Sequence, residues 1–346
     1  MIFFSLMLVV FLSPLPYAAN RPWSWSLWAL LIALLAICWS IHALIKKLPV
    51  DSFQQVKPVK SLALFFFLII FWVFIQMSST IPADWSHPLW NMTGKILARD
   101  ISASITLNKA DAVTAVMRLV SYTLVFWLSL CYCRDRDKAK TIFFGLMISG
   151  FIYSIYGLII HLGGFKTILW QENWYYGSLT STFVNRNHFA TYAGLTLLCS
   201  LALLSDGVQT SSNYRLGGYL GMQRFFEALI HRTWFPLLAF IVIGTALILT
   251  HSRGGFLSTL LAIAILLTAF NLNFRTRNIH VLTVISIFVI VGGSIFYVSG
   301  ETLADRFGAW VDDSAYRGRV YELTWNAIKD NPWLGYGSGS FEEVFP

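Results

Sequence analysis

The sequence has little charge. Asp, Glu, Lys and Arg make up 12% of its 346 residues, about half the share found in an ordinary soluble domain. Hydrophobic residues make up 56%. This balance argues against a chain dissolved mainly in water and favours one that lies mostly in lipid.

Cysteines are also few. The four cysteines all fall within or at the ends of apolar stretches, where cysteine behaves as a small hydrophobe. Cys131 and Cys133 form a Cys-x-Cys pair without the second pair that a zinc signature needs. We therefore expect no disulfide framework, no metal site and no cofactor.

A basic stripe with interleaved aromatic residues is missing. The formal net charge is +8, but the Lys and Arg residues are scattered among short loops. This pattern disfavours nucleic acid as a partner. Anionic lipid or an anionic substrate is the better expectation.

Long apolar runs dominate what is present. A bilayer core about 30 Å thick needs roughly 20 apolar residues per helix, and backbone groups in lipid must be satisfied internally. Leu62–Met77 and Val281–Val298 are almost continuously apolar, unlike the alternating strands of a barrel. We predict an all-α polytopic transmembrane bundle of about nine spans, near residues 1–19, 26–45, 61–78, 113–133, 141–161, 188–204, 235–250, 255–271 and 281–299.

The first apolar run, residues 1–19, has two interpretations, a membrane span or a signal peptide. It ends at Tyr17-Ala18-Ala19 like a signal peptide, yet it lacks the positive n-region of such a peptide. Either reading leaves the remaining topology unchanged.

Lys and Arg in short loops predict the orientation. They gather at residues 46–60, 134–140 and 275–277, so we expect those loops to be cytoplasmic. Residues 79–112, 162–187, 251–255 and the partly helical segment after 300 then face the other side.

The polar hexapeptide Thr250-His251-Ser252-Arg253-Gly254-Gly255 separates two apolar runs. Arginine at a helix centre costs roughly 2.5–3.5 kcal/mol, so Arg253 should lie near the interface or face a wet cavity. It either simply ends a span or binds an anion, because guanidinium offers a planar fork of donors that suits phosphate.

A second polar cluster opens the span after residue 187. Asn185, Arg186, Asn187 and His188 follow one another directly. A local capping role for Asn and His is one reading. A sugar or phosphate site at the membrane entrance is the other, in which His188 alone is weak evidence for a base.

The segment 316–331 predicts an amphipathic helix outside the membrane. Tyr316, Val320 and Leu323 recur on one face, and Arg319 lies on another. Pro332 ends the helix. Gly335, Gly337 and Gly339 follow in a loop whose N–H groups could meet phosphate, although the spacing fits no known phosphate fingerprint.

Two further charged features have competing interpretations. Asp135-Arg136-Asp137 has the Asp-x-Asp form of metal-dependent glycosyltransferases, but its basic neighbours favour a solvated turn. Arg118, inside an apolar run, is a secondary candidate because it must snorkel or line a cavity.

These motifs together resemble one family. Phe-Val-Asn-Arg-Asn-His-Phe-Ala at 183–190, Ser252-Arg253-Gly254-Gly255, and Gly318-Arg319 followed by Asn331-Pro332 and Gly335-Tyr336-Gly337 have the order and spacing of the O-antigen ligase and polymerase superfamily. The resemblance covers roughly residues 180–346. We therefore divide the chain into an N-terminal transmembrane region, 1–180, and an O-antigen ligase-related region, 181–346.

The resemblance implies a metal-independent, inverting glycosyltransferase of the bacterial inner membrane. Such an enzyme passes glycan from an undecaprenyl diphosphate donor to an acceptor glycan, lipid A core or protein on the periplasmic side, among membrane lipids. Arg253 and Arg319 match the family's diphosphate-binding arginines. The family's proposed base is a later histidine, a position that neither His188 nor His251 occupies, so we expect the chain to be truncated before it.

Two other classes remain open. One is a transporter of small anions such as bicarbonate, which should show repeated halves or broken helices at the membrane midplane. Neither is clear in this sequence. The other is a non-catalytic partner in a polysaccharide assembly complex.

Overall fold

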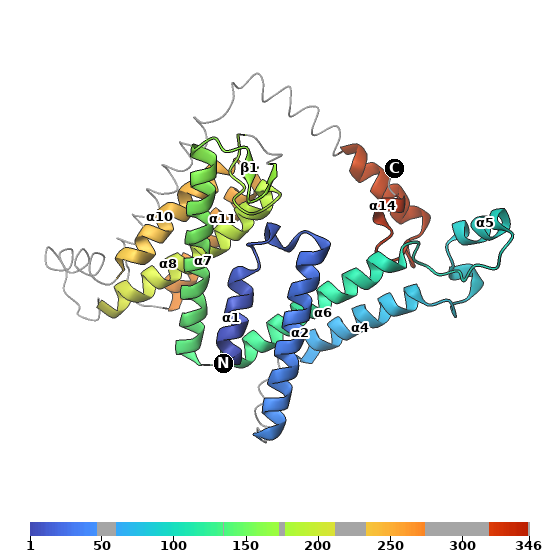
Figure 1. Ribbon diagram of the computed structural model, residues 1–346, viewed down its shortest axis with the longest axis horizontal. Coiled ribbons are helices and arrows are strands. Elements are labelled where there is room, and N and C mark those ends of the chain that lie inside the picture. Colours follow the sequence, from blue (N-terminus) through green and yellow to red (C-terminus); the bar gives the residue numbers. More distant parts are fainter. Residues whose placement is uncertain (47–59, 134, 173–176, 212–232, 274–317, 345–346) are drawn as a thin grey trace. The chain divides into compact units, whose positions relative to one another are not determined.

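The structure is a computed structural model, and it describes residues 1–46, 60–133, 135–172, 177–211, 233–273 and 318–344 (Figure 1). This part of the chain is mostly helical, with one two-stranded antiparallel sheet. The expected helical class is therefore confirmed. The predicted span 281–299 lies outside the described residues.

The elements, in chain order, are α1 (Ile2–Leu12), η1 (Tyr17–Ala19), α2 (Pro22–Ile45), α4 (Lys60–Met77), η3 (Ala83–Trp85), α5 (Pro88–Leu97), α6 (Lys109–Tyr132), α7 (Arg136–Leu162), β1 (Thr167–Ile168), β2 (Gln171–Glu172), α8 (Arg186–Ser211), α10 (Trp234–Leu249), α11 (Arg253–Asn273) and α14 (Phe341–Val344). Residues 318–330 are also helical, which confirms the helix expected there.

Among the described residues, five helices are long and apolar enough to cross a membrane: α2, α4, α6, α7 and the part of α8 up to Gly207. Shorter apolar helices are α1, α10 and Arg253–Ala269 of α11. Each expected span from 26–45 to 255–271 overlaps one of these helices. Their length and composition make the chain a multi-pass membrane protein.

The first expected span is much shorter than predicted. Helix α1 has 11 residues, which gives a length of about 16 Å. Pro14 and Pro16 follow it closely, and proline lacks the N–H that would continue the helical hydrogen bonds. The apolar run 1–19 therefore forms a short helix and a turn rather than one long span.

The chain forms two compact units. Unit 1 contains Met1–Leu31 and Ser129–Gly300, and unit 2 contains Ile32–Leu128 and Glu301–Pro346. Each unit thus combines segments that are distant in the sequence. The division of the chain at residue 180 stays a prediction.

Small residues let the helices of unit 1 pack closely. A Cβ added to Gly150 of α7 would overlap Thr196 of α8, and one added to Gly194 of α8 would overlap Thr259 of α11. Such close approach at small residues is typical of helices that associate in membranes. The core between α7, α8, α10 and α11 includes the fully buried side chains Met147, Phe189, Leu197, Ile243, Leu247 and Ile263.

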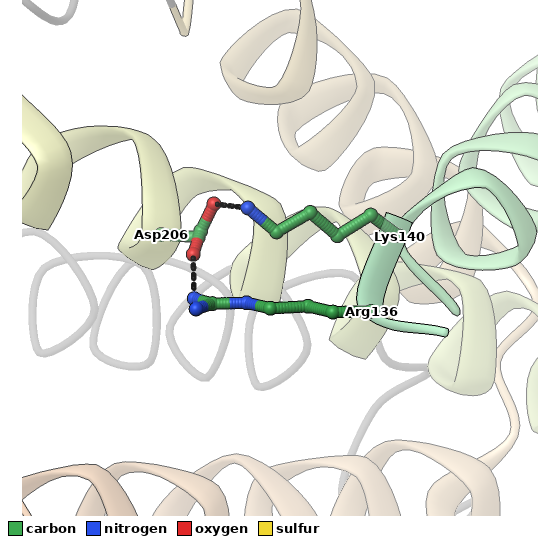
Figure 2. Close-up of polar contacts among 3 residues, drawn as sticks. All are labelled: Arg136, Lys140 and Asp206. Atoms are coloured by element: carbon green, nitrogen blue, oxygen red, sulfur yellow. Dashed lines mark hydrogen bonds and ion pairs between the residues drawn. The ribbon is translucent and has the colours of Figure 1, made fainter. Parts of the chain in front are cut away.

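One end of unit 1 carries an ion-pair cluster between α7 and α8 (Figure 2). The carboxylate of Asp206 accepts from Lys140 Nζ at 2.8 Å and from Arg136 Nη2 at 3.4 Å. Both cations belong to the loop region predicted to be cytoplasmic. The start of α7 and the end of α8 therefore lie together, and the two helices are antiparallel.

Unit 2 joins the C-terminal segment to the loop between α4 and α6. Thr106 Oγ1 donates to the carbonyl of Ser338 at 2.7 Å, and the N–H of Ser338 donates to Gln76 Oε1 at 3.0 Å. Ser340 Oγ accepts from the N–H of Leu107 at 2.8 Å. We call Gln76, Thr106, Ser338 and Ser340 the loop latch.

Candidate functional site

The first turns of α8 and α11 lie side by side in unit 1. A Cβ added to Gly255, near the start of α11, would lie 2.5 Å from the Cβ of Ala190, near the start of α8. One turn further along both helices, Thr259 meets Gly194. The helices therefore run parallel and begin at the same end of the unit.

This arrangement brings two predicted site arginines to one end. Arg186 is the first residue of α8, and Arg253 is the first residue of α11. Arg253 is exposed and Arg186 is partly buried. A helix N-terminus carries about half a positive elementary charge, so two such ends and two guanidinium groups each add positive charge at this end.

The second predicted cluster begins α8 as a cap. Asn185 Oδ1 accepts the N–H of Asn187 at 2.8 Å, which confirms the capping role expected for asparagine. Asn187 and His188 lie in the first turn with exposed side chains. They are the members of this cluster that a ligand can reach most directly.

Arg186 is oriented by a residue that the sequence did not single out. Its Nη1 donates to Ser178 Oγ at 3.1 Å. Ser178 belongs to a loop held by two further bonds: the N–H of Leu179 donates to the carbonyl of Leu249 at 3.0 Å, and Ser181 Oγ donates to the carbonyl of Tyr153 at 2.6 Å. No sequence pattern marks Ser178, because its contact depends on how this loop folds back on α10 and α7.

A small pocket lies beside this loop. It has a volume of about 80 Å³ and is lined by residues of 157–165 and 177–181, including His161 and Ser178. Small-molecule sites usually measure roughly 300–1,000 Å³. The pocket therefore has room for a few water molecules or one small group, but not for a glycan.

The predicted turn between α10 and α11 is confirmed in the fold. His251 adopts a left-handed backbone conformation with φ 52°, which reverses the chain. Ser252 is 4% exposed, and its Oγ accepts the N–H of Gly255 at 3.2 Å. Ser252 thus caps α11 and directs Arg253 to the end of the unit; its contact with substrate stays a prediction.

Arg319 belongs to the other compact unit. It lies in the helical segment 318–330 of unit 2, with an exposed side chain. Its pairing with Arg253 on a diphosphate stays a prediction. Arg118, the secondary candidate, is exposed on α6 of unit 2.

The glycines at 335–339 have a packing role. Gly337 and Gly339 have φ of 84° and 82°, and a Cβ on Gly337 would lie 2.5 Å from Thr106 Cα. The N–H groups of Gly335, Ser338 and Ser340 bind acceptors within the protein. The loop packs on the segment around Thr106, which explains its glycines without a phosphate.

The Asp-x-Asp sequence at 135–137 forms a helix cap. Asp135 Oδ1 accepts the N–H of Asp137 at 3.0 Å, and Lys138 lies 3.6 Å from Asp135. All three residues are exposed. The solvated-turn reading is therefore confirmed. In the described part of the chain, no three His, Cys, Asp or Glu residues are grouped closely enough to hold a metal ion.

Comparison with known proteins identifies the C-terminal part of the chain. Residues 238–346 match the family described as O-antigen ligase. No curated protein and no solved structure matches the chain. The matched stretch begins in α10 and contains both Arg253 and Arg319, whereas Arg186 and its neighbours precede it.

The match supports a role in membrane polysaccharide assembly, with a glycosyltransferase-like activity on lipid-linked glycan and an acceptor. It agrees with the apolar helices that surround the site. The chain is thus a membrane protein whose residues 238–346 match the O-antigen ligase family, which supports the resemblance to O-antigen ligases and polymerases.

Proposed function

We propose that this chain transfers or polymerises glycan from an undecaprenyl diphosphate-linked donor at the periplasmic face of the inner membrane, without a metal ion. The acceptor is a hydroxyl of a glycan, lipid A core or protein. The observation that carries the proposal is the pairing of the α8 and α11 N-termini, each of which begins with an arginine.

The chemistry requires stabilisation of a leaving diphosphate. Negative charge grows on the bridging oxygen as the glycosidic bond breaks, and fixed cations stabilise it most when they are already oriented. Helix N-termini favour anions through their free N–H groups and their dipole. Two parallel helix starts with Arg186 and Arg253 fit these requirements.

Each site residue then has a distinct role. Arg253, which is exposed, binds the diphosphate through its planar fork of donors. Arg186, hydrogen-bonded to Ser178, adds positive charge beside it. Asn187 and His188 face outward in the first turn of α8 and bind sugar hydroxyls, while Asn185 and Ser252 hold the helix ends in place.

Arg319 supplies the second cation of the diphosphate clamp in this proposal. It lies on the exposed helical segment 318–330 within the matched domain. An arginine that contacts the diphosphate of the donor contributes to donor binding as well as to stabilising the leaving group. We therefore expect its substitution to affect donor binding as well as transfer.

The basic cluster of unit 1 supports the proposed sidedness. Arg136 and Lys140 lie in the first two turns of α7, at the opposite end of the helix from the loop that follows Leu162. Basic loops favour the cytoplasm. If this end is cytoplasmic, the arginines that begin α8 and α11 face the periplasm.

The test is a glycan-transfer assay in membranes that contain the chain and labelled undecaprenyl diphosphate-linked oligosaccharide. Arg253→Ala should lower transfer by about 100-fold or more, the usual effect of removing one oriented donor from a developing anion. Arg319→Ala should also lower transfer. Arg253→Lys should restore it only in part, because lysine keeps the charge but loses the fork.

Arg136→Ala is the matched control. Arg136 is also exposed and also begins a helix, but it lies at the other end of unit 1. Unchanged transfer in Arg253→Ala and Arg319→Ala would overturn the site assignment. Equal loss in Arg136→Ala would mean that folding or insertion, rather than the site, had been damaged.

A further inference from the structure

Helix α5 has one apolar face. Leu89, Met92 and Ile96 recur at intervals of three and four residues, whereas Asn91 and Lys95 lie away from them around the helix. None of its ten residues is buried. The exposed fractions are 46% for Leu89, 60% for Met92 and 83% for Ile96.

Local residues determine where α5 begins and ends. His87 caps it by accepting the N–H of Leu89 at Nδ1, 3.2 Å away, and Pro88 occupies the first turn. Ala98 ends it in a left-handed conformation with φ 50°. The ten residues are about 15 Å long, half of what the bilayer core requires, so α5 does not cross a membrane.

Hydrogen bonds hold the start of α5 at the ends of two spans. The N–H of Thr106 donates to the carbonyl of Gln76 in the last turn of α4, and the N–H of His87 donates to the carbonyl of Ser104, both at 3.1 Å. The next span, α6, begins at Lys109. Figure 1 shows α5 beyond the ends of α4 and α6.

The position of α5 at the ends of two spans indicates which part of the membrane surrounds it. A span ends where hydrocarbon gives way to lipid headgroups, so a helix attached to two span ends lies at that boundary. Trp85 is 41% exposed just before α5, and Lys109 Nζ lies 6.0 Å from the centre of the Trp90 ring. Tryptophan and lysine both favour the membrane interface.

We propose that α5 lies flat on the bilayer at the surface where α4 ends and α6 begins, with Leu89, Met92 and Ile96 in phospholipid. Short amphipathic helices bind membranes by burying such a face at the boundary of headgroups and acyl chains. Asn91 and Lys95 then face water. The inference is independent of the sugar chemistry proposed above.

The test uses single cysteines in the full chain, with Cys38, Cys131, Cys133 and Cys199 replaced by serine. Ile96→Cys and Asn91→Cys are labelled with a small fluorophore and reconstituted in phosphatidylethanolamine and phosphatidylglycerol vesicles. Quenching is measured with spin-labelled lipid and with aqueous iodide. The label at 96 should be quenched by the lipid and protected from iodide, and the label at 91 should show the reverse.

Two outcomes would overturn the proposal. Iodide access at both positions would mean that α5 lies in water. Protection of position 96 from both quenchers would mean that protein, such as a second copy of the chain, covers the face. Met92→Cys and Lys95→Cys repeat the comparison if either first variant fails to insert.

Discussion

The hydroxyl groups of Thr106 and Ser340 lie 3.0 Å apart, although 234 residues separate them in the sequence. Both side chains are fully buried. Thr106 Oγ1 also bonds to the carbonyl of Ser338, and Ser340 Oγ accepts the N–H of Leu107. The loop latch thus attaches the C-terminal part of the matched stretch, residues 238–346, to the loop between α4 and α6.

Removal of the Thr106 hydroxyl should release this attachment. Thr106→Val keeps the shape but removes the donor to the Ser338 carbonyl and one of the two partners of the Ser340 hydroxyl, which costs about 1–3 kcal/mol. We expect faster proteolysis of residues 318–344 in the full chain. Thr324→Val is the control, since Thr324 bonds only within its own helix, to the carbonyl of Val320. Equal proteolysis of both variants would contradict the latch.

Substitution of Gly335 and of Gly337, which lie beside the loop latch, should have unequal effects on stability. Gly335→Ala meets no atom within 4 Å and bears only the strain of φ 64°, about 1–2 kcal/mol. Gly337→Ala bears similar strain and also forces a Cβ to 2.5 Å from Thr106 Cα. Thermal unfolding in detergent should therefore show a larger loss for Gly337→Ala. A loss no larger than that of Gly335→Ala would refute the close approach.

The contact between α8 and α11 predicts a difference between two adjacent glycines. Gly255→Ala places a Cβ 2.5 Å from Ala190, and such overpacking costs about 1–3 kcal/mol. Gly254→Ala meets no atom within 4 Å. We expect Gly255→Ala to displace Arg253 from Arg186 and to lower glycan transfer, whereas Gly254→Ala should retain normal transfer. The glycan-transfer assay measures this difference. Similar activities of the two variants would argue against the paired starts of α8 and α11.

The cap of α5 should depend on pH. Burial lowers the pKa of His87 from its ordinary value of 6.5, so its stabilising effect is complete above that value and is lost as the pH falls through the lower folded pKa. Protonation of Nδ1 also removes the acceptor for the N–H of Leu89. Hydrogen exchange of residues 87–97, corrected for its intrinsic rate, should therefore speed up as the pH is lowered below the ordinary pKa of histidine, 6.5.

His87→Asn separates the cap from the titration. Asparagine is a good cap and does not titrate in this range, so the pH dependence of exchange should disappear while protection near neutral pH remains. If exchange in this variant still rises at low pH, some other group is responsible.

The sequence determined the features that depend on neighbouring residues. Apolar runs predicted the helices from 26–45 to 255–271 because lipid leaves the backbone no other way to satisfy its hydrogen bonds. Asn185 was expected to cap α8, and the turn at His251 was expected between two apolar runs; both are present. Pro14 and Pro16 lie directly after α1, and the predicted span 1–19 did not take account of them.

Only the tertiary structure decided how distant segments meet. Gly194 and Gly255 permit α11 to approach α8, and Thr106 receives the glycine loop from more than 200 residues away. A small residue in an apolar run looks the same whether it faces lipid or another helix, so its neighbour cannot be read from local pattern. The paired arginines at the starts of α8 and α11 depend on that packing, because each sequence motif specifies a helix start but not which other helix start lies beside it.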